Sequence, residues 1–258
     1  MEAQGKVIVI TGASSGIGAA LARRLGAAGH RLALGARREP ELKQVASELG
    51  TDALAVVTDV TRRESVEHLC DEALGAFGCV DVWVNNAGRG ISRPVLELTD
   101  ADFDEMMAVN VKSALYGMQA IVPHFIARGE GHLINVSSFL GRVPLATHRS
   151  AYNAAKAALN ALTANLRVDL RASHPSIHVS LVMPGLVSTG FARNALGSTG
   201  AVAAPPAGPM KPQTPEEVAA MIESLIEHPV AEIYTNPASP AMARRYFEDV
   251  EAFEKGAR

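Results

Sequence analysis

Two side chains that can exchange a proton stand four residues apart, at Tyr152 and Lys156 in the stretch Ser-Ala-Tyr-Asn-Ala-Ala-Lys. On a helix this spacing places both on one face, about 5.4 Å apart along the axis. A free phenol has a pKa of about 10, and a fixed ammonium nearby favours the phenolate. The pair therefore predicts a proton-exchanging enzyme. Because exposed helices often carry this spacing by chance, the hypothesis depends on the motifs around it.

A glycine-rich turn lies near the start of the chain. The stretch Thr-Gly-Ala-Ser-Ser-Gly-Ile-Gly follows a β-branched run and opens a helical pattern. Glycines let the backbone turn tightly and bring its amides against a pyrophosphate, while the helix N-terminus adds positive potential. In this position the turn favours a nucleotide site over a plain tight turn. The expected phosphate-binding residues are Gly12, Ser14, Ser15, Gly16, Ile17 and Gly18.

Short apolar runs alternate with helical patterns along the chain. Most of the runs are apolar throughout, which is typical of a parallel sheet covered by helices on both faces. Right-handed helical crossovers between parallel strands predict an α/β fold, a doubly wound parallel sheet in a single domain over residues 1–258. The expected strands are residues 6–11, 31–36, 53–58, 80–85, 131–136, 178–183 and 232–235, and the expected helices are 16–28, 62–77, 99–110 and 111–128.

Local patterns predict further details of these elements. Thr61 with Glu64, and Thr214 with Glu217, match the capping box of a helix N-terminus. The stretch 194–213 is rich in Ala, Gly, Ser and Pro and leaves the carboxyl edge of the sheet, so we expect a mobile substrate lid, with a slack surface loop as the alternative. Apolar residues at helical spacing predict a C-terminal helical tail over 240–258.

Composition narrows the classes of function. The chain has 258 residues, 48% of them hydrophobic and 20% charged, as in an ordinary globular protein. A net charge of −3 gives no reason to expect nucleic acid or a membrane as a partner. The start lacks the basic and apolar regions of a signal peptide, so we expect a cytoplasmic protein. Cys70 shares an apolar helical stripe and is expected to be a buried thiol, and no metal site is assigned.

Taken in order, these motifs resemble the short-chain dehydrogenase/reductase family over nearly the whole chain. The resemblance implies a Rossmann-type fold, NAD(H) or NADP(H) as cofactor, and hydride transfer between the cofactor and an alcohol or carbonyl. The motifs that carry it are the glycine-rich turn at 11–18, Asn-Asn-Ala-Gly at 85–88, Asn110, Ser138, Tyr152 with Lys156, and Pro184 with Gly185.

The resemblance also implies roles for single residues. Tyr152 corresponds to the proton donor and acceptor, and Ser138 to the residue that holds the substrate oxygen. Lys156 corresponds to the residue that binds the nicotinamide ribose and tunes the phenol, and Asn110 to one that orders a water. Ser137 is a local alternative to Ser138, although a glycine three residues on favours Ser138. Further cofactor contacts are implied for Asp59, Val60, Asn86, Ala87, Gly88, Tyr152, Lys156, Pro184, Gly185, Val187 and Thr189.

Arg37 and Arg38 end the second expected strand, where an NAD site usually has an acidic residue. Arginines offer forked donors to a 2′-phosphate, although arginines at a strand end are often only solvated. No acidic residue precedes Glu39 in this turn. The sequence therefore favours NADP(H) over NAD(H) as the cofactor.

The leading hypothesis is an NADP(H)-linked oxidoreductase acting on a small carbonyl compound or secondary alcohol. Apolar residues at 139–148 and 186–191 suggest a hydrophobic ketone. The alternatives are an NAD-linked alcohol dehydrogenase and a non-catalytic dinucleotide-binding sensor or scaffold. The helix at 111–128 is apolar on more than one face, and with the resemblance it predicts a homodimer or homotetramer.

Replacing Arg37 tests the assignment of the cofactor phosphate. We expect Arg37→Asp to raise the KM for NADPH at least about tenfold more than the KM for NADH, because it removes a phosphate donor and adds a repelling charge. Steady-state rates with both cofactors measure this. Equal changes in the two KM values would contradict the assignment.

Overall fold

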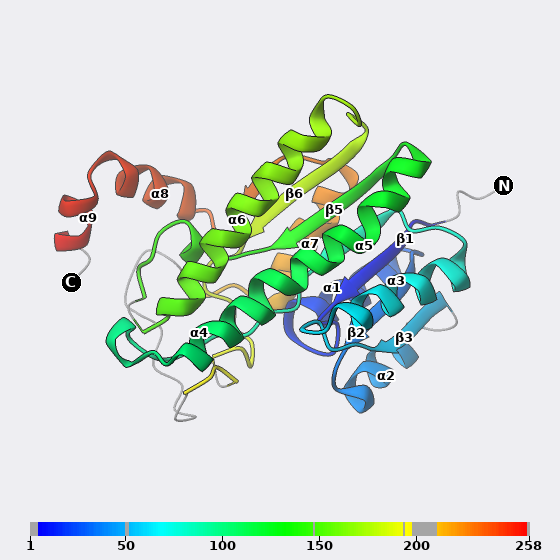
Figure 1. Ribbon diagram of the computed structural model, residues 1–258, viewed down its shortest axis with the longest axis horizontal. Helices are drawn as coiled ribbons and strands as arrows, with labels where there is room; N and C mark the ends of the chain where they lie inside the picture. Colours follow the sequence, from blue (N-terminus) through cyan, green and yellow to red (C-terminus); the bar gives the residue numbers. More distant parts are fainter. Residues whose placement is uncertain (1–4, 50–51, 147, 193, 198–210, 257–258) are drawn as a thin grey trace.

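The computed structural model describes residues 5–49, 52–146, 148–192, 194–197 and 211–256. Seven parallel strands form one sheet in the order β3-β2-β1-β4-β5-β6-β7 (Figure 1). The predicted doubly wound parallel sheet is confirmed. Its strands are β1 (Val7–Thr11), β2 (Arg31–Ala36), β3 (Ala53–Val57), β4 (Val82–Asn85), β5 (Gly131–Val136), β6 (Ile177–Met183) and β7 (Glu232–Tyr234).

Helices cover both faces of the sheet (Figure 1). On one face, α1 (Gly16–Ala27), α2 (Glu39–Glu48) and α7 (Pro215–Glu227) pack apolar side chains against the strands. On the other face, α3 (Arg63–Phe77), α5 (Ser113–Arg128) and α6 (Ser150–Arg171) do the same. Both faces of the strands are thus removed from water, which explains why the runs are apolar throughout.

The helices differ from the sequence predictions in two respects. The helix α2 was missed, because only Leu42, Val45 and Ala46 of its ten residues are buried and its apolar periodicity is short. The expected helices at 99–110 and 111–128 are α4 (Asp100–Met107) and α5, joined by a π-helical turn at Ala108–Lys112. An extra residue in one turn is not visible in apolar spacing, and such turns are frequent at functional sites.

One predicted capping box is confirmed and one is wrong. The Thr214 hydroxyl accepts from the Glu217 amide, and the Glu217 carboxylate accepts from the Thr214 amide. At α3 the N-cap is Arg62, without a side-chain cap, because the Thr61 hydroxyl donates to Asp59 instead. An unpredicted capping box starts α4, where Thr99 pairs with an aspartate rather than a glutamate.

The expected lid lies mostly outside the described residues, which omit 198–210. The described ends of this segment are fixed to the sheet edge. The Leu196 amide donates to the Gly90 carbonyl, and the Gln213 amide donates to the Leu186 carbonyl. These ends therefore lie against the loops that follow β4 and β6.

The expected C-terminal helical tail consists of two helices, α8 (Ser239–Glu248) and α9 (Val250–Gly256). The rings of Tyr246 and Phe253 meet edge to face, with centroids 5.5 Å apart. Both rings pack near Phe139 and Val143, which follow β5. The tail therefore covers the loop after β5 within the same chain.

Much of the apolar surface of α5 is covered by the chain itself. Met118, Val122 and Phe125 are buried against α3 and the sheet, and Ile126 is 41% exposed. This helix therefore gives little support for a partner subunit.

Cys70 is buried, as predicted. Among the described residues, no helix combines the length and hydropathy required to cross a bilayer.

Candidate active site

The glycine-rich turn occupies the carboxyl end of β1, beside β4, where the strand order reverses direction. Gly12 and Gly16 have φ values of +70° and +56°, a region that side chains strongly disfavour. A Cβ on Gly18 would lie 2.4 Å from the Gly12 carbonyl oxygen. Glycine is thus required for the turn and for the close approach of α1.

The N-terminus of α1 is suited to an anion. Its N-cap, Ser15, makes no side-chain capping hydrogen bond, and no acidic residue lies in the first turn. Amides at a helix start have no partner within the helix and carry positive potential. Thr189 approaches from the loop after β6, since a Cβ on Gly16 would lie 3.4 Å from its Cγ2. The expected phosphate-binding turn and Thr189 thus lie on the same crevice.

The Asn-Asn-Ala-Gly motif ties the end of β4 to this turn. The Asn86 side-chain amide donates to the Thr11 carbonyl at 2.9 Å. The Thr11 hydroxyl accepts from the Asn86 and Ala87 amides. Asn85 accepts from Trp83 and donates to Asn135 inside the core. The side chain of Asn86 therefore holds the turn together, and Gly88 is the residue of the motif that borders the catalytic side chains.

The two arginines after β2 lie at the same sheet edge. An Arg38 Nη atom lies 3.2 Å from the Ser14 hydroxyl, and Arg38 also pairs with Glu41. Arg37 is exposed and close to Asp59. Burial tends to raise the pKa of Asp59, but hydrogen bonds from Thr61 and the charge of Arg37 outweigh it and lower that pKa. The arginines therefore flank the glycine-rich turn.

Tyr152 and Lys156 are buried on α6, with exposed fractions of 7% and 3%. Lys156 Nζ donates to the Val136 carbonyl at 2.9 Å and lies 5.8 Å from the centroid of the Tyr152 ring. The amine is thereby held between α6 and the end of β5. The pair occupies one helix face, one turn apart, as the spacing predicts.

Burial dominates the protonation of both groups. It raises the pKa of Tyr152 to about 12, against a hydrogen bond from Ser138 and the charge of Arg149, which lower it. It lowers the pKa of Lys156 to about 7. The phenol pKa is therefore raised rather than lowered as expected, because removal from water disfavours the phenolate more strongly than Ser138 and Arg149 favour it.

Ser137 and Ser138 point to different partners. The Ser137 hydroxyl contacts Asn160 at 2.5 Å and the Lys156 carbonyl at 3.3 Å, both on α6. The Ser138 hydroxyl accepts from the Leu140 amide and bonds to Tyr152. Ser138 is thus the serine beside the phenol, and Ser137 fastens the end of β5 to α6.

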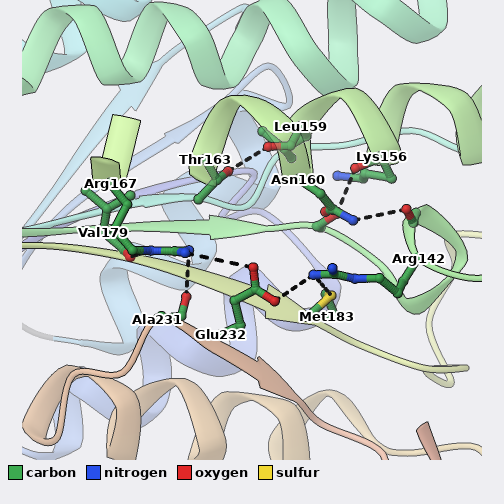
Figure 2. Close-up of polar contacts among 12 residues, drawn as sticks. Arg142, Lys156, Leu159, Asn160, Thr163, Arg167, Val179, Met183, Ala231 and Glu232 are labelled. Atoms are coloured by element: carbon green, nitrogen blue, oxygen red, sulfur yellow. Dashed lines mark hydrogen bonds and ion pairs between the residues drawn. The ribbon is translucent and has the colours of Figure 1, made fainter. Parts of the chain in front are cut away.

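The loop after Ser138 lies against α6 (Figure 2). A Cβ on Gly141 would lie 2.7 Å from the Lys156 carbonyl carbon, which explains the glycine three residues after Ser138. Asn160 donates to the Gly141 carbonyl. Figure 2 also shows Glu232 of β7 between Arg142 and Arg167, which anchors the far side of this loop.

Asn110 lies on the π-helical turn and is buried. Its side-chain nitrogen donates to the Arg89 carbonyl at 2.9 Å, and its oxygen accepts from the Arg89 amide at 3.2 Å. A Cβ on Gly88 would lie 3.0 Å from Asn110 Oδ1 and 3.6 Å from Lys156 Nζ. Gly88 therefore lets the β4 loop pass between these two side chains.

The remaining expected cofactor contacts follow the carboxyl ends of β3 and β6. The Pro184 carbonyl accepts from the Phe139 amide at 2.8 Å, which joins the loops after β5 and β6. Gly185 packs against Asn236, and Val187 bridges to Gln213. Val60 is buried in the α3 side of the core.

Phe191 was expected as an apolar wall of the substrate pocket, whereas Arg149 was missed by sequence reasoning. The Phe191 ring meets the Tyr152 ring edge to face, with centroids 5.4 Å apart. Arg149 lies three residues before Tyr152, and one of its Nη atoms donates to the Ile91 carbonyl at 2.9 Å. The place of Arg149 three residues before Tyr152, at the start of α6, could have indicated it. In contrast, Phe139 and Val143, expected as pocket walls, are core residues.

Comparisons with known proteins agree with this architecture. The profile of the family described as short chain dehydrogenase matches residues 6–198. An uncharacterized oxidoreductase of Staphylococcus epidermidis is 36% identical over 184 residues, 71% of this chain and 79% of that protein. A short-chain dehydrogenase/reductase from Burkholderia phymatum in complex with NAD has a TM-score of 0.86 at 30% identity, covering 98% of this chain and 96% of that chain.

A third similar structure is an alcohol dehydrogenase from Thermococcus sibiricus complexed with 5-hydroxy-NADP. Its TM-score is 0.78 at 31% identity, covering 91% of this chain and 97% of that chain. The fold and the site together define a Rossmann-type oxidoreductase. The chain belongs to the short-chain dehydrogenase/reductase family.

The burial of Lys156 predicts a pH-dependent stability difference. Its pKa of about 7 in the folded protein lies below its ordinary value of 10.5. Below about pH 7 Lys156 is protonated in both the folded and the unfolded state, so the full cost of burying its charge opposes folding. Above about pH 7 the amine loses its proton in the folded state but keeps it in the unfolded state. The free energy of unfolding therefore rises with pH until about pH 10.5. Lys156→Met should therefore raise Tm relative to the parent most at about pH 6, and less at about pH 9.

Thermal unfolding of both proteins without added dinucleotide, across this pH range, measures the difference. Exposed Lys43→Met is the matched control and should give a difference that does not change with pH. A Tm difference for Lys156→Met that is constant or grows with pH would contradict the prediction.

Proposed function

We propose that this enzyme transfers a hydride between NADP(H) and a small carbonyl compound or secondary alcohol. The observation that carries the proposal is the convergence of Ser138, Tyr152 and Lys156 beside a glycine-rich nucleotide turn. A non-catalytic sensor would have no need of a buried phenol and amine at this point. Their burial cost is therefore an argument for chemistry.

The chain's own residues supply the proton and the positioning. The bound nicotinamide supplies or accepts the hydride. Reduction of a carbonyl leaves an alkoxide, which needs a proton at once, and the Tyr152 phenol is the nearest acid. Its raised pKa keeps it protonated at neutral pH, which is the form that reduction requires. The Ser138 hydroxyl holds the same oxygen with a hydrogen bond.

Lys156 and Asn110 assist the proton transfer from Tyr152. Lys156 carries part of its charge near neutral pH, because its pKa is lowered to about 7. A charged amine one turn from the phenol stabilises the phenolate left after proton transfer. Asn110, on its π-helical turn, lies across Gly88 from the amine, and we propose that it orders a water on the proton path.

NADP(H) is favoured over NAD(H) by charge. Arg37 and Arg38 flank the turn, and Arg38 lies against Ser14. A guanidinium matches a 2′-phosphate, whereas an NAD site uses a carboxylate at this strand end. Similar structures carry either cofactor, with NAD in the Burkholderia phymatum protein and 5-hydroxy-NADP in the Thermococcus sibiricus protein. NAD-linked dehydrogenation is therefore the second candidate function.

The substrate side of the site has apolar walls. Leu140 and Phe191 pack around Tyr152, and Leu186, in the loop after β6, is exposed. These walls support a hydrophobic ketone or alcohol.

We further propose a homodimer or homotetramer in the cytoplasm, where a reducing compartment suits the free thiols of Cys70 and Cys79.

Oxidation of NADPH and NADH with a panel of ketones, and reduction of NADP⁺ and NAD⁺ with the matching alcohols, tests the proposal. We expect turnover that is faster with the phosphorylated cofactor. No turnover of any ketone or alcohol, with dinucleotide binding intact, would favour the sensor and contradict the proposal.

The two adjacent serines give a matched pair of variants. Ser138→Ala should lower kcat by about a hundredfold to a thousandfold, because it removes a hydrogen bond to the reacting oxygen. Ser137→Ala should lower Tm, since it breaks the contact with Asn160, while activity is retained. Steady-state kinetics and thermal unfolding of both proteins measure this. The reverse pattern would assign the substrate contact to Ser137.

A further inference from the structure

Three arginines gather where the loop after β4 meets the start of α6. Arg89 pairs with Glu105, and Arg93 pairs with Asp102 at 3.3 Å. Arg149 pairs with no carboxylate among the described residues, and its guanidinium donates a hydrogen bond to the backbone carbonyl of Ile91. Arg149 is therefore the one of the three whose charge is not balanced by an acid among the described residues.

Arg149 lies close enough to the catalytic phenol for the two groups to interact through their charges. It is the N-cap residue of α6 and precedes Tyr152 by three residues. A Cβ on Gly90 would lie 3.0 Å from Arg149 Nη1 and 2.8 Å from Phe191 Cε1. Phe191 in turn packs on the Tyr152 ring. The guanidinium and the phenylalanine ring therefore both border Gly90, and that ring packs on the phenol.

The surroundings of Arg149 make an unpaired charge unfavourable. Burial lowers its pKa, and the nearby Tyr152 is the only group that raises it. A cation that is partly removed from water without an anion costs stability, and removing a partner from such a group costs more. His148, the titratable neighbour in sequence, is exposed and its own pKa is lowered by burial and then by Arg149. Among the described residues, no carboxylate therefore offsets the charge of Arg149.

We propose that Arg149 binds a carboxylate on the substrate, so that the enzyme acts on an α- or β-oxo acid and the corresponding hydroxy acid. The proposal rests on the proposed function and names its substrate class. With one donor committed to the Ile91 carbonyl, the guanidinium retains further N–H donors for a carboxylate. The apolar remainder of the substrate would contact Phe191 and Leu140.

The carboxylate takes no part in the bond changes. In reduction the hydride adds to the carbonyl carbon, the C=O π bond breaks, and the oxygen takes the proton of Tyr152. The oxo acid is reduced to a hydroxy acid and the dinucleotide is oxidised. Arg149 is then a specificity-determining residue, which fixes the carbonyl next to the phenol by holding the other end of the molecule.

Matched pairs of substrates test the proposal. The probes are pyruvate, acetoacetate and benzoylformate, each beside its methyl ester, which keeps the carbonyl and removes the charge. For at least one pair the parent enzyme should show a kcat/KM about tenfold or more higher for the acid. In Arg149→Met the acid-to-ester ratio should fall toward one, and Arg149→Lys should restore part of it.

Arg93→Met is the matched control, because it removes a nearby cation that Asp102 already neutralises. It should leave the acid-to-ester ratio unchanged. Dinucleotide binding and thermal unfolding establish that each variant is folded, and if Arg149→Met does not fold, the parent ratio and Arg149→Lys decide.

The outcomes separate this inference from the proposed function. An ester that is reduced as well as its acid in every pair, or an Arg149→Met variant that lowers acid and ester rates equally, would overturn the inference and indicate that Arg149 acts only on the phenol. Turnover of neutral ketones would still support hydride transfer in that case. Absence of turnover with every acid, ester and ketone would overturn both.

Discussion

A single buried hydrogen bond, from Lys156 to the Val136 carbonyl, organises the site. An amine that is removed from water must have a partner, and this one lies at the carboxyl end of β5. The bond therefore fixes α6 against the sheet edge in one position. Tyr152, one turn earlier on the same face, is fixed with it. The position of the phenol at the end of β5 depends on this register between helix and strand.

The neighbouring contacts serve the same purpose through the backbone. Gly141 allows the loop after β5 to touch α6, and Ser137 fastens that strand end to Asn160. Gly88 lets the loop after β4 pass between Asn110 and Lys156. Because these contacts fix the loops after β4 and β5, the hydroxyls of Ser138 and Tyr152 stay within hydrogen-bonding distance of each other. Such prior positioning is what a reaction between bound groups needs.

The sequence predicted the sheet well because buried parallel strands are apolar on both faces, and β2 and β5 begin and end at the expected residues. It could not predict the π-helical turn at Asn110, which changes hydrogen bonding without changing apolar spacing. The pairing state of Arg149 depends on residues far along the chain, so no local pattern reveals it. The protonation of Tyr152 was expected to follow Lys156, but burial is a property of the whole fold.

The proton transfer by Tyr152 is the central claim, and its removal is the most direct measurement. For Tyr152→Phe, with the fold and dinucleotide binding verified, kcat should fall by about a hundredfold to ten-thousandfold on a substrate that the parent enzyme turns over. A rate equal to that of the parent would show that another group moves the proton, and the account of the buried phenol and amine would be wrong.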